Sequence, residues 1–95
     1  MHILKDLNKV IISGKVVNTP TLRMAGSKPV TNFSLKSSYD NMVYHKIIAW
    51  DSVAEDAVKT IKQDDQITVD GEIIYRTKKD ITEIEIKAYR IIRSE

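Results

Sequence analysis

Apolar and polar residues alternate along most of this chain, in segments separated by short polar turns. Residues 8–17 (NKVIISGKVV) are rich in β-branched residues and predict a strand, with a bulge or sharp bend at Gly14. Residues 30–38 (VTNFSLKSS) alternate, as do residues 43–50 (VYHKIIAW) after the polar turn at 39–42 (YDNM). Because successive side chains of a strand point to opposite faces, these two segments predict a β-hairpin with one apolar face.

The hydrophobic period changes directly after Trp50. In residues 51–62 (DSVAEDAVKTIK) the apolar residues recur at helical spacing, and Ser52 is followed three residues later by Glu55, which is the form of a capping box. This pattern predicts one amphipathic helix of about three turns.

Alternation returns after the helix, in two segments joined by the short turn TKKD (77–80). Residues 66–76 (QITVDGEIIYR) and 81–92 (ITEIEIKAYRII) predict a second hairpin. One face of its first strand is predicted to pack inward and consists of Ile67, Val69, Gly71, Ile73 and Tyr75. In its second strand we expect Ile84, Ile86 and Ala88 to face the core, as Phe33 does in the first hairpin.

The predicted order is three strands, one helix and two strands, with residues 21–24 (TLRM) starting the second strand. Five antiparallel strands with a helix between strands 3 and 4 are the connectivity of an OB-fold, a partly open five-stranded barrel with mostly β structure. A length of 95 residues without linkers or repeats predicts that 1–95 is a single OB-fold domain. OB-folds bind oligonucleotides or oligosaccharides but also proteins, so the fold alone does not give the function.

The distribution of charge along the chain says more about possible partners than the net charge of +2 does. Residues 1–50 hold seven Lys or Arg and two Asp, whereas residues 51–72 hold two Lys and seven acidic residues. A domain of this kind can present a positive face to a polyanion, although mixed charge also suits an ordinary solvated surface.

The residues needed for catalysis or metal binding are sparse. The chain has no cysteine, and its two histidines, His2 and His45, form no metal-binding motif. The adjacent Asp64 and Asp65 point in different directions and suit a polar turn. We therefore expect no enzyme activity, no metal and no cofactor. The chain has neither a signal-peptide pattern nor an apolar run of membrane-spanning length, so we expect a cytoplasmic protein that does not bind membranes.

The strand at 43–50 has an unusual second face. Val43, His45, Ile47 and Ala49 point one way, and the opposite face carries Tyr44, Lys46, Ile48 and Trp50. Exposed aromatic rings can stack on nucleobases, at about 1 to 3 kcal/mol per base, and a neighbouring cation can meet a phosphate. Taken alone, aromatic residues of strands are more often packed in a core or an interface. The aromatic face is therefore a hypothesis.

Further basic residues lie near this face in the predicted hairpins. Lys36 follows Asn32 and Ser34 on the solvent side of the neighbouring strand, Arg23 enters the same region, and Arg76 and Lys78 belong to the second hairpin. Tyr89 has the opposite parity to Ile84 and Ile86, so we expect it to be exposed or to lie at an interface. His45 points inward by parity and is expected to support packing or an interface.

Several segments, in their order along the chain, resemble the bacterial single-stranded DNA-binding proteins of the OB-fold type. They are LNKVIISGKV, TLRM, VTNFSL, YHKIIAWDSVAE, VDGEI and ITEI. The resemblance implies that Tyr44 and Trp50 stack on DNA and that Lys46 is a basic contact. The family is also usually basic at the positions of Lys9, Arg23 and Arg76. His45 matches a histidine near a subunit contact, which implies a homo-oligomer, either a dimer or a tetramer that pairs through the first strand.

The resemblance also implies roles in DNA replication, recombination or repair in the bacterial nucleoid, with partners such as a helicase or polymerase. The chain departs from the family in three features. Its hairpin turns YDNM and TKKD are short, which predicts a smaller footprint, and Lys78 stands where the family often has an aromatic residue. No acidic C-terminal tail follows KAYRIIRSE, so we expect little recruitment of partners through a tail. Such a compact form would suit a phage, a plasmid or another mobile genetic element.

Two alternatives remain open from the sequence. An OB-fold subunit of a replication complex could use the Tyr44 and Trp50 face to dock on a protein. Single-stranded RNA would be bound by the same stacking, because discrimination depends on contacts to the 2′-hydroxyl.

Overall fold

The computed structural model describes residues 6–37 and 43–94 of the chain. In these ranges the backbone forms β1 (Val10–Val16), β2 (Arg23–Ala25), β3 (Lys28–Lys36), β4 (Tyr44–Trp50), α1 (Asp51–Thr60), β5 (Gln66–Lys78) and β6 (Ile81–Arg93). The predicted order is confirmed, except that residues 23–25 form a separate short strand, β2, which pairs with the start of β3. The helix therefore lies between β4 and β5, and not between strands 3 and 4. The predicted turn at 39–42 lies outside the described residues.

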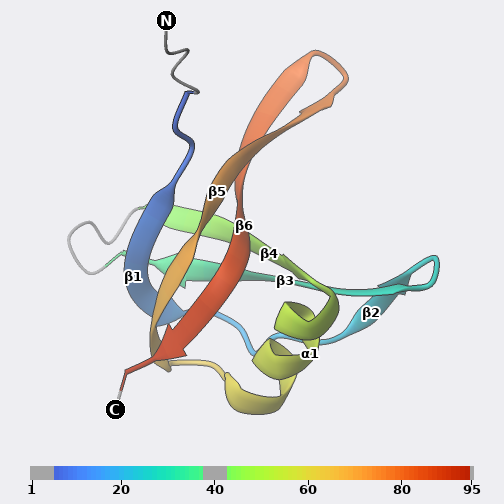
Figure 1. The fold of residues 1–95 in the computed structure, drawn as a ribbon. Coiled ribbons are helices and arrows are strands. Elements are labelled where there is room, and N and C mark those ends of the chain that lie inside the picture. The colour runs from blue at the N-terminus through green and yellow to red at the C-terminus, as the bar shows by residue number, and fades with distance from the viewer. Residues whose placement is uncertain (1–5, 38–42, 95) are drawn as a thin grey trace, which may run out of the picture.

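Five of the strands close into a ring, as Figure 1 shows. The sheet has the order β1-β5-β6-β4-β3-β2, and an additional pairing of β1 with β3 completes the ring. Gly14 allows the close approach of β1 to β3, because a Cβ at this position would lie 2.7 Å from the carbonyl oxygen of Lys36. The β1–β5 register runs through Gly14 without a shift, so there is no bulge, which was one of the two alternatives predicted there besides a sharp bend.

One ladder of the ring differs from the antiparallel prediction. β4 and β6 pair in parallel, with Ile47 opposite Ile86 and Ile48 opposite Lys87. The reason is the route of the chain, which crosses from β4 through α1 to β5 on the far side of β6. The β5–β6 hairpin then returns beside β4, so β6 runs in the same direction as β4.

The barrel interior is filled by the side chains that the alternation predicts to be apolar. The buried cluster consists of Val16, Phe33, Leu35, Ile47, Ala49, Ala54, Ala57, Ile61, Ile67, Val69, Ile86 and Ala88. Three of these residues come from α1 and the residue after it, because the helix packs against β3, β4 and β6. Val43, which the alternation places on the same face as Ile47 and Ala49, lies before the start of β4 and is exposed.

The helix begins two residues earlier than the capping-box pattern predicts, since that pattern makes Ser52 the N-cap. Trp50 is the N-cap residue and makes no side-chain cap hydrogen bond, and Asp51 is the first helical residue. Asp51 has φ of +56°, a left-handed conformation that Asp tolerates better than most residues. Because the strand runs into the helix without a linker, Ser52 lies inside the first turn and cannot act as the cap. In the described part of the chain, no helix is long and apolar enough to cross a membrane.

The β5–β6 hairpin extends beyond the barrel as an arm (Figure 1). Its turn is as short as predicted, with Lys79 and Asp80 both at positive φ, which is the pattern of a two-residue type I′ turn. The strands themselves have 13 residues each, so the hairpin as a whole is long. Tyr75, predicted to be in the core, is 68% exposed, and its cross-strand partner Ile84 is also exposed. Their parity is inward, but the barrel ends before this part of the arm.

Candidate nucleic-acid interface

The outer face of β3 and β4 carries the side chains that the sequence singles out. Cross-strand partners share a face in an antiparallel pair, and the register places Lys36 opposite Tyr44 and Ser34 opposite Lys46. Asn32 lies opposite Ile48 and Val30 opposite Trp50 in the same register. Ile47 and Ala49 are buried on the barrel side, as the alternation predicts, but Ile48 and Val30 on the outer face are buried as well.

Trp50 lines a depression of about 450 Å³, to which residues of β5 and β6 also contribute. The other residues that line it are Lys28, Asp51, Glu72, Ile74, Arg76 and Lys87. Three cations and two carboxylates, those of Asp51 and Glu72, therefore line the same depression as Trp50. Neither Lys28 nor Lys87 forms an ion pair with any residue that the structure describes.

The sequence reasoning missed Lys28 and Lys87. Lys87 alternates with the buried Ile86 and Ala88, so its outward parity could have been read. Its position beside β4 depends on the parallel β4–β6 ladder, which alternation along one segment does not reveal. Lys28 is the first residue of β3 and, two residues before Val30, points to the same side of the strand. That β3 begins at residue 28 follows from its pairing with β2, which the sequence does not reveal.

Tyr44 occupies the opposite end of β4 from Trp50. It is exposed and borders a second depression, of about 400 Å³, with His45, Lys46, Glu83, Ile84 and Ile86. The two aromatic positions are six residues apart along the strand, a distance of about 20 Å. Ile48, between them on the same face, is only 1% exposed. The face therefore has two separate aromatic positions and not one continuous stacking surface.

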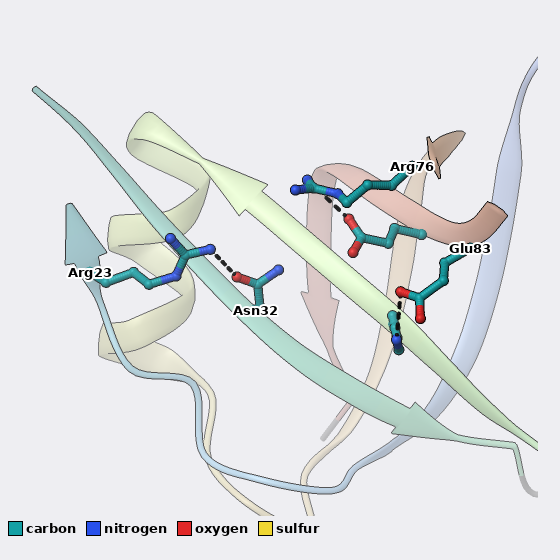
Figure 2. A network of polar contacts seen from close by, with 6 residues as sticks. Arg23, Asn32, Arg76 and Glu83 are labelled. Carbon is teal, nitrogen blue, oxygen red and sulfur yellow. Dashed lines mark hydrogen bonds and ion pairs between the residues drawn. The ribbon is translucent and has the colours of Figure 1, made fainter. Parts of the chain in front are cut away.

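Polar contacts hold three of the predicted basic residues, as Figure 2 shows. Lys46 Nζ donates a hydrogen bond to Glu83 Oε2 at 3.0 Å. Arg23 Nη2 donates to the side-chain oxygen of Asn32 at 2.7 Å. Arg76 Nη2 lies 3.3 Å from Glu85 Oε1.

The two ion pairs differ in burial. The side chains of Lys46 and Glu83 are 57% and 50% exposed, and an exposed pair of this kind contributes about 0 to 1 kcal/mol. In the second pair Arg76 is 53% exposed, but the side chain of Glu85 is only 11% exposed. Glu85 Oε1 is buried and accepts no hydrogen bond from the described residues, so the contact with Arg76 is purely an ion pair. The charge of Arg76 is what compensates this buried carboxylate.

A hydrogen-bonded tyrosine lies beside the Trp50 depression. Tyr89 is exposed, in agreement with its predicted parity, and its hydroxyl donates to Glu72 Oε1 at 2.5 Å. This hydrogen bond raises the pKa of the Tyr89 phenol. Lys87 Nζ lies 5.6 Å from the centre of the Tyr89 ring. Lys87 thus lies near the Tyr89 ring and lines the depression with Trp50, and it forms no ion pair with a described carboxylate.

The remaining predicted residues lie at the edges of the outer face or away from it. Lys36 is half-buried beside Tyr44, and Lys78 lies near the tip of the arm. Lys9 precedes β1. In the sheet order, β5 and β6 lie between β1 and β4, so Lys9 is not brought together with Trp50. His45 is half-buried opposite Leu35, and its role at an oligomer interface stays a prediction.

Comparisons with known proteins give a consistent relationship. The model of the single-strand binding protein family matches residues 7–95. The Single-stranded DNA-binding protein 2 of Chlorobaculum tepidum is 30% identical over 105 aligned residues, which cover 93% of this chain and 71% of that protein. The crystal structure of the SSB domain of a Synechococcus sp. protein superposes with a TM-score of 0.80 at 19% identity, over 95% of this chain and 99% of that one, and so shares the OB-fold. The chain belongs to the single-strand binding protein family.

Proposed function

We propose that this protein binds single-stranded DNA without catalysis, by stacking bases on Trp50 and Tyr44 and holding phosphates with nearby cations. The observation that carries the proposal is the depression that Trp50 lines together with Lys28, Arg76 and Lys87. Membership of the single-strand binding protein family supports it.

The two aromatic positions suggest how a strand would lie. One base stacks near Trp50 and another near Tyr44, while the backbone runs along the outer face of β4 past Lys46. Every base has a π-face, so binding of this kind tolerates sequence. The buried Ile48 between the rings leaves the intermediate bases without a stacking partner on β4.

A titration of Trp50 fluorescence tests the proposal. Trp50 is the only tryptophan of the chain, so its emission reports one position. We expect oligo-dT to quench the emission at low salt, and the affinity to fall steeply with salt because bound phosphates release counterions. Unchanged emission with no detectable binding would contradict the proposal. Parallel titrations with oligo-rU and duplex DNA measure the preference over RNA and over double strands.

A homo-oligomer and a place in replication, recombination or repair belong to the same proposal. His45 and β1 are the expected subunit contacts, and a measurement of molar mass in solution tests them. One observation favours the alternative of a protein-docking subunit: Tyr75 and Ile84 form an exposed apolar pair on the arm. Salt-insensitive association with a protein partner, without affinity for any oligonucleotide, would select that alternative.

A further inference from the structure

Two carboxylates of β6 share the outer face with the proposed DNA contacts. Glu83 and Glu85 are two residues apart and therefore point to the same side of the strand. Each lies against one cation that was predicted to bind phosphate, Lys46 for Glu83 and Arg76 for Glu85. Two of the cations on this face are therefore already paired with carboxylates of the protein itself (Figure 2).

We infer that Glu83 competes with nucleic-acid phosphate for Lys46, and so lowers both the affinity of the face and its dependence on salt. This inference rests on the proposed binding of single-stranded DNA. Both partners of the Lys46–Glu83 pair are about half exposed, so each can turn into solvent without leaving a buried charge. A phosphate that reaches Lys46 can therefore displace Glu83, as the carboxylate is rehydrated.

Glu85 has a different role because of its burial. If Arg76 turned away to a phosphate, the carboxylate of Glu85 would be left without compensation in a largely buried position. Arg76 is therefore held beside the Trp50 depression that it lines. Of the two pairs, the one at Lys46 is free to exchange and the one at Arg76 is fixed.

The exchange at Lys46 has a signature in the salt dependence. A cation that neutralises a phosphate of a single strand contributes about 0.7 to the slope of log K against log salt. When the phosphate displaces Glu83, the freed carboxylate takes up a counterion in return, which offsets much of that contribution. Removing the charge of Glu83 should restore the full contribution of Lys46 to the salt slope.

The experiment compares Glu83→Gln with Glu55→Gln in binding of labelled oligo-dT at several salt concentrations. Glu55 is an exposed residue of α1, so its substitution removes the same charge away from the outer face of β3 and β4. Glu83→Gln should tighten binding by up to about fivefold at low salt, the equivalent of about 1 kcal/mol for an exposed ion pair. Its salt slope should steepen by up to about 0.7, whereas Glu55→Gln should leave the slope unchanged.

A double-mutant cycle with Lys46→Gln identifies the cation involved. Lys46→Gln should weaken binding more in the Glu83→Gln background than in the wild type, because only there is Lys46 unopposed. If the wild type binds and Glu83→Gln behaves like Glu55→Gln, the competition is refuted while the proposed function stands. If no variant binds oligo-dT, both are overturned.

Discussion

Replacement of Trp50 by alanine tests the proposed interface most directly. Loss of a stacked base costs about 1 to 3 kcal/mol, which corresponds to a decrease in affinity of about fivefold to 150-fold. We expect Trp50→Ala to fall in the upper half of that range, because Lys28 and Lys87, which line the same depression, form no ion pair with a described residue. Tyr44→Ala should fall in the lower half, since its neighbouring cation, Lys46, is already paired with Glu83.

The assay must not depend on tryptophan emission, which the substitution removes. Fluorescence polarisation of labelled dT12 measures the affinity of both variants, and Trp50→Phe is the control that keeps an aromatic ring at the position. The two aromatic positions are about 20 Å apart, so their effects should add to within about 0.5 kcal/mol in the double variant. Thermal unfolding of each variant controls for loss of structure. A folded Trp50→Ala protein with less than a twofold loss of affinity would refute the stacking model.

Three further predictions concern stability. Arg76→Ala should lower the free energy of unfolding in urea by about 1 to 3 kcal/mol, because Glu85 loses the only ion-pair partner that it has among the described residues. An unchanged midpoint would contradict the role of this pair. Gly71→Ala should lower the free energy of unfolding by about 3 kcal/mol in the same assay, because its Cβ would lie 2.0 Å from the carbonyl oxygen of Lys87. Gly71 lies at the shift in the β5–β6 register. A loss below about 1 kcal/mol would show that the two strands can separate there. Tyr89→Phe tests the raised pKa of Tyr89. Because the pKa is higher in the folded than in the unfolded protein, the phenol stabilises the fold below its unfolded pKa of about 10. This contribution is lost as the pH rises through the folded pKa. Stability of the wild type should therefore decline relative to Tyr89→Phe above about pH 10, and parallel pH profiles would argue against the hydrogen bond to Glu72.

The sequence predicted the elements of the fold better than their contacts. Alternation along 30–36 and 44–50 and the helical period after Trp50 identified the segments, because each is a local property of the chain. The parallel β4–β6 ladder depends on how the ring closes, and no single segment carries that information. The exposure of Tyr75 was missed for the same reason, since parity gives the direction of a side chain but not where the barrel ends.

For the site, the parity of β4 correctly placed Tyr44, Lys46 and Trp50 on one face. Parity did not predict that Ile48, between them on that face, is buried. The carboxylates on the same face were not anticipated, because Glu83 comes from a strand that reaches Lys46 only through the closed ring. Basic residues are easily counted in a sequence, whereas their pairing is a property of the assembled sheet.

The junction between β4 and α1 has a consequence for the entropy of binding. Trp50 is at once the last residue of a paired strand and the N-cap of the helix, and Asp51 turns the chain without a linker. The backbone beneath the indole ring thus loses its conformational freedom when the protein folds, and little remains to be lost when a base arrives. A ring carried on a mobile loop would have to be ordered by each ligand, at the expense of affinity. Trp50 is preorganised because the strand and the helix share it.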